Sequence, residues 1–357
     1  SLNCSSFDEF ILNLAPEIVL FDRFMLEEQF GWRVAKHCPK ALRILDTEDL
    51  HSLRHARHQA LKQNREIAPA DLNSELAKRE IAAIFRCDLS LIISDFEFAL
   101  LKDHYAVPEH ILLHCPFMLD LDDFTQSQKQ FNEREYFISI GNFRHEPNWD
   151  AVLFLKQQIW PLIRKQLPKT ELHIFGAYPP PKVTQLHNPK QGFIVKGWAE
   201  DAKQVMESAR ICLAPLRFGA GIKGKLAEAM YCGTPNVTTK IGSEGMEFES
   251  PWPGLITDLT AFDNQPEAAL DFANQAVQLY QQQPLWEQKQ QDGYQLIKAY
   301  FNKNTIQANL LERIKWIADR LDTHRENNFI GLMLQHHQLK STQYMAQWIE
   351  AKNKNKP

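Results

Sequence analysis

Short apolar runs alternate along most of the chain with segments in which apolar residues recur every three or four positions. The short runs have the length and composition of buried β-strands, and they cover residues 18–21, 43–46, 89–94, 111–114, 136–141, 171–175, 193–195, 211–214 and 236–239. One of the periodic segments places these apolar residues on a single helical face: Trp149, Val152, Leu153, Leu155, Ile159, Trp160 and Ile163. Strands that alternate with helices predict an α/β fold with parallel sheets, each covered by helices on both faces.

A polar stretch at residues 120–135 separates two such sets of strands and helices, which is typical of a linker between domains. A chain of 357 residues also exceeds the usual size of one hydrophobic core. We therefore expect two domains, at residues 1–130 and 131–320. From Pro266 onward the pattern is wholly helical, and residues 321–357 are expected to form a helical tail.

One stripe of the helix predicted in that tail is apolar, and we expect this stripe to pack on the protein. It carries Ile330, Leu334, His337, Met345 and Trp348. A peripheral membrane helix or a partner-binding helix is the alternative, but its polar face has few lysines before Lys352, which weakens the membrane interpretation.

The composition narrows the class of protein. It is 44% hydrophobic and 24% charged, as is typical of a globular protein. A formal net charge of −4 argues against a broad basic surface, so no nucleic-acid partner is expected. No apolar run approaches the ~20 residues that span a bilayer, and no signal-like start is present. The six cysteines are scattered without a CxxC pair, which favours reduced thiols in a cytoplasmic protein over disulfides or a zinc site.

The segment at residues 211–230 is rich in glycine and lysine, and it formally contains a dinucleotide-binding pattern. Gly219, Gly221 and Gly224 have the spacing of GxGxxG. That site needs its first glycine directly after a strand and an acid at the end of the next strand. Other residues intervene here, and the next strand ends at Lys240 with no acid. We therefore reject NAD binding.

The run from Gly219 to Lys225 also matches the start of a triphosphate-binding loop, but Leu226 stands where Ser or Thr must hold Mg²⁺. A third interpretation rests on the property that the two patterns share, which is a glycine-rich loop at the start of a helix. Glycines expose backbone N–H groups at a helix N-terminus, where the helix dipole favours anions. Lys223 and Lys225 add positive charge, and Glu228 can accept hydrogen bonds from ribose hydroxyls. The segment thus predicts a site for a ribose with a diphosphate, the alternative being a loop whose lysines are merely solvated.

Several motifs follow one another in a fixed order between Tyr136 and Met246. They are IGNFRHEPNWDA at residues 140–151, IWP at 159–161, LHIFG at 172–176, GWAED at 197–201, APL at 214–216, GAGIKGK at 219–225, EAM at 228–230, GTP at 233–235, TT at 238–239 and SEG at 243–245. Together they resemble the C-terminal domain of a group 1 (family 4) retaining glycosyltransferase. The resemblance implies a GT-B fold, which consists of two Rossmann-like domains.

The resemblance also implies the residues of a donor site. Gly141 would end the first strand beside the donor phosphates, and Gly197-Trp198 would flank the nucleotide base. Glu228 matches the second glutamate of the E-x7-E motif, which binds the ribose, whereas the first glutamate falls on Ala220. The expected donor-binding residues are Gly141, Arg144, Gly197, Trp198, Gly219, Gly221, Ile222, Lys223, Lys225, Leu226 and Glu228.

The N-terminal half contains the catalytic candidates. Residues 43–54 resemble the strand end where members of the family place an active-site histidine; here Glu48 or Asp49 takes that place, with His51 close by. The alternative is a loop of solvated charges, and the basic cluster at residues 54–58 is expected to be a solvated helix face. A complete first domain of this fold opens with further strands, so we expect this domain to be partial, with acceptor-binding residues upstream of Ser1.

By resemblance, the protein transfers a sugar from a nucleoside diphosphate sugar to an acceptor hydroxyl, with retention at the anomeric carbon. A helix N-terminus with lysines can stabilise the departing diphosphate, so neither a metal nor another cofactor is expected. The acceptor is expected to be a sugar, a lipid-linked group or a protein, in the assembly of a surface polysaccharide or glycoconjugate. A non-catalytic nucleotide-sugar-binding scaffold and a GT-B epimerase remain alternatives.

Overall fold

The computed structural model describes residues 4–121, 124, 129–248, 251–259 and 265–354, apart from the side chains at 265 and 337–340. Each strand predicted from the apolar runs is confirmed, with small differences at the ends. One further strand, β10 (Gly254–Thr257), was not predicted. It is short and only partly buried, and it follows Pro251-Trp252-Pro253, a sequence that is typical of a turn.

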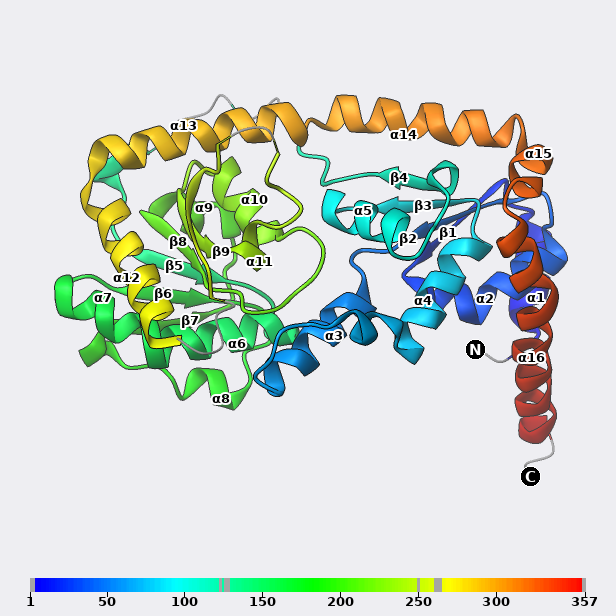
Figure 1. Cartoon of the computed structure of the whole chain (residues 1–357), viewed down its shortest axis with the longest axis horizontal. Helices are drawn as coiled ribbons and strands as arrows, with labels where there is room; N and C mark the ends of the chain where they lie inside the picture. The colour runs from blue at the N-terminus through cyan, green and yellow to red at the C-terminus, as the bar shows by residue number, and fades with distance from the viewer. Residues whose placement is uncertain (1–3, 122–123, 125–128, 249–250, 260–264, 355–357) are drawn as a thin grey trace. The chain divides into compact units, whose positions relative to one another are not determined.

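The larger sheet has six parallel strands in the order β10–β9–β8–β5–β6–β7 (Figure 1). Besides β10, its strands are β5 (Phe137–Ile140), β6 (Leu172–Phe175), β7 (Phe193–Gly197), β8 (Ile211–Ala214) and β9 (Asn236–Thr239). β5 lies between β6 and β8, so the chain extends the sheet from β5 first in one direction and then in the other. This order is that of a doubly wound Rossmann-like sheet.

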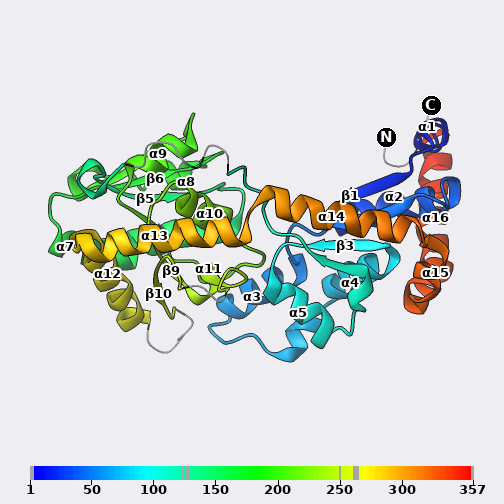
Figure 2. The same ribbon diagram turned by 90° about the horizontal axis from the view of Figure 1, so that it is seen from above.

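Helices cover both faces of this sheet (Figures 1 and 2). On one face, Phe137 and Ile211 belong to a core cluster that includes residues of α6 (Glu146–Phe154), α7 (Trp160–Gln166) and α12 (Gln265–Gln281). On the other face, Ile138 and Cys212 pack with residues of α9 (Ala202–Ser208) and α10 (Gly224–Tyr231). Neighbouring strand residues thus point to opposite faces, which is why both faces need apolar residues and the strands are continuous apolar runs.

The predicted apolar stripe at residues 149–163 is confirmed as a core-facing surface. It spans α6, a π-helical turn (Leu155–Ile159) and α7, and Leu155, Ile159 and Ile163 are fully buried. Trp160 is also buried, and its indole Nε1 donates a hydrogen bond of 2.7 Å to the carbonyl of Gln191. The polar atom of the largest side chain in this stripe is therefore satisfied inside the core.

The smaller sheet has four parallel strands in sequential order, β1 (Ile18–Asp22), β2 (Leu42–Asp46), β3 (Leu89–Ile92) and β4 (Leu112–His114). The helices in the same part of the chain include α1 (Ser6–Leu14), α2 (Phe24–His37), α4 (Glu75–Arg86) and α5 (Asp95–Asp103). Ile317 of α14 (Lys303–Ala318) joins β2 and β3 residues in one core cluster. A segment from near the C-terminus therefore completes the core around these early strands.

Contacts divide the chain into two compact units at positions that differ from the predicted boundaries. The first unit comprises residues 1–53, 68–116 and 305–357, and the second comprises residues 54–67 and 117–304. Residues 305–320 were predicted in the second domain, and 321–357 as a separate tail. Both segments belong to the first unit, which therefore contains most of α14 together with α15 (Leu321–Glu326) and α16 (Phe329–Lys354).

The predicted packing of α16 on the protein is confirmed, since it contacts α4 and α2, but the predicted packing face is wrong. Ile330, Met345 and Trp348 are 44%, 58% and 60% exposed. The helix packs instead through small residues such as Gly331, which is buried. The side chain of His337 lies outside the described part of the chain. In the residues that the structure describes, no helix combines the length and apolarity needed to cross a membrane.

Replacing Gly331 with alanine is expected to lower the free energy of unfolding by about 1–2 kcal/mol through overpacking. A Cβ at this position would lie 2.2 Å from the carbonyl oxygen of Phe85, on the backbone of α4. Trp348→Ala removes a far larger but exposed side chain, and is expected to change stability by less than about 0.5 kcal/mol. Urea denaturation measures both, and a larger loss for Trp348→Ala would restore the predicted stripe as the packing face.

Candidate functional site

A cavity of about 290 Å³ lies at the point where the strand order of the six-stranded sheet reverses. β5 and β8 are adjacent, and the residues that follow them diverge to opposite faces of the sheet, which leaves a crevice beyond their carboxyl ends. The cavity is lined by Ile140, Gly141, Asn142, His145, Pro147, Asn148, Leu216, Phe218, Gly219, Ala220, Ile222, Lys223, Gly224, Lys225 and Glu228. The fold thus places the glycine- and lysine-rich segment at the usual ligand position of a doubly wound sheet.

The loop between β8 and α10 brings a helix N-terminus to this cavity. Gly221 adopts φ of +62°, which favours glycine, and the next residues lead into the first turn of α10. Lys223 is the N-cap of α10, and no side chain caps the helix there. Its ammonium Nζ donates a hydrogen bond of 2.7 Å to the Gly221 carbonyl. The first-turn N–H groups and the helix dipole favour an anion at this end of α10.

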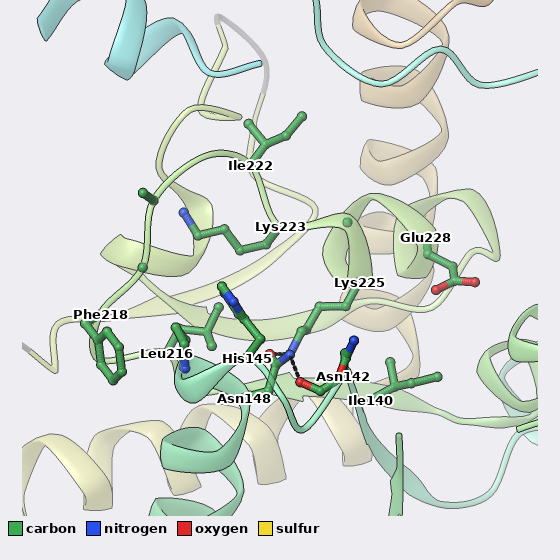
Figure 3. Close-up of a pocket in the computed structure, with 15 residues that line it drawn as sticks. Ile140, Asn142, His145, Asn148, Leu216, Phe218, Ile222, Lys223, Lys225 and Glu228 are labelled. Carbon is green, nitrogen blue, oxygen red and sulfur yellow. Dashed lines mark hydrogen bonds between the residues drawn. The ribbon is translucent and has the colours of Figure 1, made fainter. Parts of the chain in front are cut away.

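Lys225 lies in the first turn of α10 and points into the cavity toward the β5 side (Figure 3). Its Nζ donates a hydrogen bond of 2.6 Å to Oδ1 of Asn148, while Nδ2 of Asn148 donates one of 2.9 Å to the Asn142 carbonyl. Burial lowers the pKa of Lys225 to about 8. The hydrogen-bond partner of this lysine, Asn148, is neutral. An anionic ligand in the cavity would therefore stabilise the charged form of Lys225.

Gly141 permits the contact between Lys225 and Asn148. A Cβ at Gly141 would lie 2.7 Å from Cγ of Asn148, so any larger residue would displace that amide. The lysine thus comes from α10, and the amide that holds it comes from α6.

Glu228 lies about one helical turn beyond Lys225 and lines the same cavity (Figure 3). Its side chain is partly buried, and burial raises the pKa of its carboxyl, which the charge of Lys203 opposes. A partly desolvated carboxylate at a cavity rim is well suited to accept hydrogen bonds from hydroxyl groups. This position agrees with the ribose-binding role that the resemblance implies.

The structure brings six of the predicted donor-binding residues together around the cavity. They are Gly141, Gly219, Ile222, Lys223, Lys225 and Glu228. Gly221 adjoins them through its carbonyl, which accepts the bond from Lys223. Leu226, however, is fully buried in the core, and its N–H donates to the Lys223 carbonyl, so its side chain does not line the cavity. A contact of Leu226 with a donor stays a prediction. The α-helical spacing that turns Lys225 and Glu228 toward the cavity turns Leu226 away from it.

Three other predicted residues lie outside the cavity lining. The guanidinium of Arg144 sits 3.7 Å from the ring centre of Tyr178. Gly197 has φ of +78°, and its carbonyl accepts a hydrogen bond of 2.7 Å from the Gly176 N–H. Trp198 is 69% exposed. A contact of Gly197 and Trp198 with a nucleotide base stays a prediction.

Two residues of α3 (His51–Lys62) contact the cavity loop, although the basic cluster at residues 54–58 was predicted to be solvated. Arg57 bonds the carboxylate of Glu244 and the Gly219 carbonyl, and His58 stacks on Phe218. For these two residues the prediction of a solvated face is wrong. Their partners lie far away in the sequence. No local spacing could have revealed them.

The catalytic candidates Glu48, Asp49 and His51 lie in the first unit, at the start of α3. Glu48 is exposed and adopts φ of +61°. Nε2 of His51 is 3.4 Å from Oδ1 of Asp49, and the His51 backbone N–H donates a 2.9 Å hydrogen bond to Glu80. Burial raises the pKa of Glu80 to about 7. These contacts order the segment, and its part in catalysis stays a prediction.

Two parallel sheets, the larger with a cavity at its switch point, define an α/β protein with the fold of GT-B glycosyltransferases. Residues 134–282 match the family model of glycosyl transferases group 1. The segment that forms the cavity is therefore similar to group 1 glycosyl transferases, in agreement with the order of motifs. Among curated proteins, no sequence matches this chain significantly.

Solved structures agree on the fold. TarM from S. aureus, in complex with fondaparinux, alpha-GlcNAc-glycerol and UDP, has a TM-score of 0.65 and 12% identity, over 86% of this chain and 57% of TarM. The pneumococcal O-GlcNAc transferase GtfA with UDP and GlcNAc has a TM-score of 0.62 and 16% identity, over 90% and 60%. HepE from Anabaena with UDP and glucose has a TM-score of 0.65 and 13% identity, over 87% of this chain and 81% of HepE. The chain thus spans less than two thirds of TarM and of GtfA.

Proposed function

We propose that this protein binds a nucleoside diphosphate sugar in the switch-point cavity and transfers the sugar to an acceptor hydroxyl. The observation that carries the proposal is the convergence of Lys223, Lys225 and the N-terminus of α10 on one cavity of a group 1 glycosyltransferase domain. Two lysines and a helix dipole supply positive potential for a diphosphate. They do so without a metal, so the proposed reaction needs none.

The nucleoside is proposed to extend from the diphosphate toward Glu228. The carboxylate of Glu228 accepts bonds from the ribose hydroxyls, and Gly197 with Trp198 flank the base. Uridine diphosphate is the first nucleotide to test, because the TarM, GtfA and HepE structures contain UDP. Ala220 stands at the first glutamate of the E-x7-E motif, which handles the sugar in many members of the family, so the resemblance assigns no particular sugar.

In the proposed reaction, the bond between the anomeric carbon and the diphosphate oxygen breaks, and a bond to the acceptor oxygen forms with retention. The diphosphate leaves with the electron pair and takes up the proton of the acceptor hydroxyl, and Lys225 and the α10 N–H groups stabilise its charge. The acceptor hydroxyl belongs to a sugar, a lipid-linked group or a protein, in polysaccharide or glycoconjugate assembly. We place the reaction in the cytoplasm, which the free cysteines support.

A non-catalytic nucleotide-sugar-binding protein is the second candidate, and Ala220 favours it because the side chain that contacts the sugar is missing. Turnover separates the two, since even slow hydrolysis of the donor requires catalysis. A GT-B epimerase would instead release free diphosphate without any acceptor.

A thermal-shift panel of nucleoside diphosphate sugars tests the proposal. A ligand at 100 times its dissociation constant stabilises the protein by about 2.7 kcal/mol, which shifts the melting temperature measurably. The cognate donor is expected to raise the melting temperature and to be consumed over time. The absence of a shift with every donor would contradict donor binding, and a shift without consumption would favour the non-catalytic candidate.

Glu228→Gln is expected to weaken binding of the cognate nucleoside diphosphate about tenfold, because it removes the charge of the carboxylate that accepts hydrogen bonds from the ribose hydroxyls. The affinity loss is expected to change little with salt, since the partner is a neutral hydroxyl. Isothermal titration calorimetry measures it, with Glu207→Gln, on the neighbouring α9, as the matched control. Equal affinities of wild type and Glu228→Gln would remove Glu228 from the site.

A further inference from the structure

Two consecutive residues of α3 contact the loop that lines the donor cavity. Nη1 of Arg57 donates a 2.9 Å hydrogen bond to the carbonyl of Gly219. The His58 ring stacks on Phe218, with ring centres 4.3 Å apart and planes within 3°. Gly219 and Phe218 both line the cavity, and both belong to the unit that includes residues 54–67. This part of α3 therefore holds the loop at two adjacent residues, Phe218 and Gly219.

Arg57 also forms a two-pronged ion pair with Glu244. Its Nη1 and Nη2 lie 2.7 and 2.8 Å from the two carboxylate oxygens, and the two side chains are only 10% and 16% exposed. Glu244 directly follows α11 (Lys240–Ser243), which is capped by the Thr239 hydroxyl through the Gly242 N–H. A guanidinium held at two points by a carboxylate has little freedom, so its bond to the Gly219 carbonyl has a fixed direction.

Phe218 is held from the α3 side in the same way. It is 1% exposed, and burial lowers the pKa of the His58 ring that stacks on it. The preceding residue, Arg217, pairs with Asp150 of α6. The loop therefore has fixed residues immediately before its first glycine, and Arg57 fixes that glycine itself.

We infer that Arg57 and Glu244 are positioning residues for donor binding, which hold the Gly219–Lys223 loop in its binding conformation. The inference rests on the proposed function for the identity of the ligand. A loop with two glycines has many accessible conformations, and ordering it costs conformational entropy. The ion pair orders the loop in the free protein, so the N-terminus of α10 and its lysines are preorganised for a diphosphate.

The first measurement uses the free protein. Hydrogen–deuterium exchange of peptides covering residues 218–223 reports local opening of the loop. Arg57→Ala and Glu244→Gln are each expected to speed exchange there by about fivefold or more, while peptides from β5 and β6 keep their rates. Arg57→Lys keeps the charge but not the two-pronged geometry, so it is expected to lie between wild type and alanine. The matched control is Arg79→Ala, which breaks an arginine–glutamate pair of the first unit (2.6 and 3.0 Å to Glu28).

The second measurement is the dissociation constant of uridine diphosphate, with the other nucleoside diphosphates as further arms. Arg57→Ala is expected to weaken binding by about tenfold, with little change for Arg79→Ala. Unchanged loop exchange in both Arg57→Ala and Glu244→Gln overturns the inference, as does faster exchange with wild-type affinity. If the wild-type chain binds no nucleoside diphosphate, the proposed function fails, and the exchange result alone decides whether the ion pair orders the loop.

Discussion

Replacing Lys225 with alanine is expected to weaken the binding of a nucleoside diphosphate by about tenfold to a hundredfold. Losing a hydrogen bond between charged groups costs about 1.5–3 kcal/mol, which corresponds to that range. The effect is expected to shrink as salt rises, because phosphate contacts are partly screened. Calorimetric titration at two ionic strengths measures both. Lys240→Ala is the matched control, since Lys240 is exposed and pairs with Asp258 instead.

The same lysine predicts how the affinity depends on pH. Lys225 has a pKa of about 8 in the free protein, so it loses its charge as pH rises above that value. An anionic ligand binds the charged form, so binding above pH 8 requires the uptake of a proton. The affinity is therefore expected to fall by up to about tenfold for each further pH unit. Lys225→Arg stays charged throughout and is expected to lose this dependence. A wild-type affinity that is constant from pH 7 to 9.5 would contradict the role of Lys225.

Replacing Asp88 with alanine is expected to lower the free energy of unfolding of the first unit by about 3–5 kcal/mol. The Asp88 carboxylate is 3% exposed and accepts two 2.8 Å hydrogen bonds from the guanidinium of Arg325, which follows α14. It also accepts one of 2.8 Å from the Arg43 backbone N–H and lies 3.6 Å from its guanidinium. Alanine would leave the buried Arg43 without its carboxylate, and Arg325 would keep only its hydrogen bonds to the carbonyls of Pro39 and Ala41.

Chemical denaturation of Asp88→Ala measures this loss, with the exposed Asp322→Ala of α15 as the control, expected within about 0.5 kcal/mol of wild type. Although burial acts in the opposite direction, the hydrogen bonds from Arg325 and the charge of Arg43 hold the pKa of Asp88 below its ordinary value. Its stabilising contribution is therefore present above the ordinary aspartate pKa and is lost as pH falls through the lowered one. A wild-type-like midpoint for Asp88→Ala would show that the arginines are satisfied without it.

The lining of the cavity could be predicted to a large extent from the sequence. The glycines and lysines of residues 219–225 and Glu228 lie within ten positions of one another, at the end of a strand and the start of a helix. Local spacing therefore sets which of them face the cavity. Leu226 was assigned to the site by adjacency alone, and helical geometry turns it into the core. The partner of Lys225 could not be assigned, because Asn148 is 77 positions away.

The sequence by itself determined the strands, their parallel arrangement and the position of the glycine- and lysine-rich loop, because buried parallel strands must be apolar along their whole length and such runs are visible locally. Only the tertiary structure decided which charges meet. Arg57 and Glu244 are 187 positions apart, and Arg325 and Asp88 are 237 apart. It also decided the packing face of α16, where Gly331 allows close backbone approach and the large apolar side chains stay exposed. Burial depends on shape complementarity between distant segments, and hydrophobicity along one segment does not encode it.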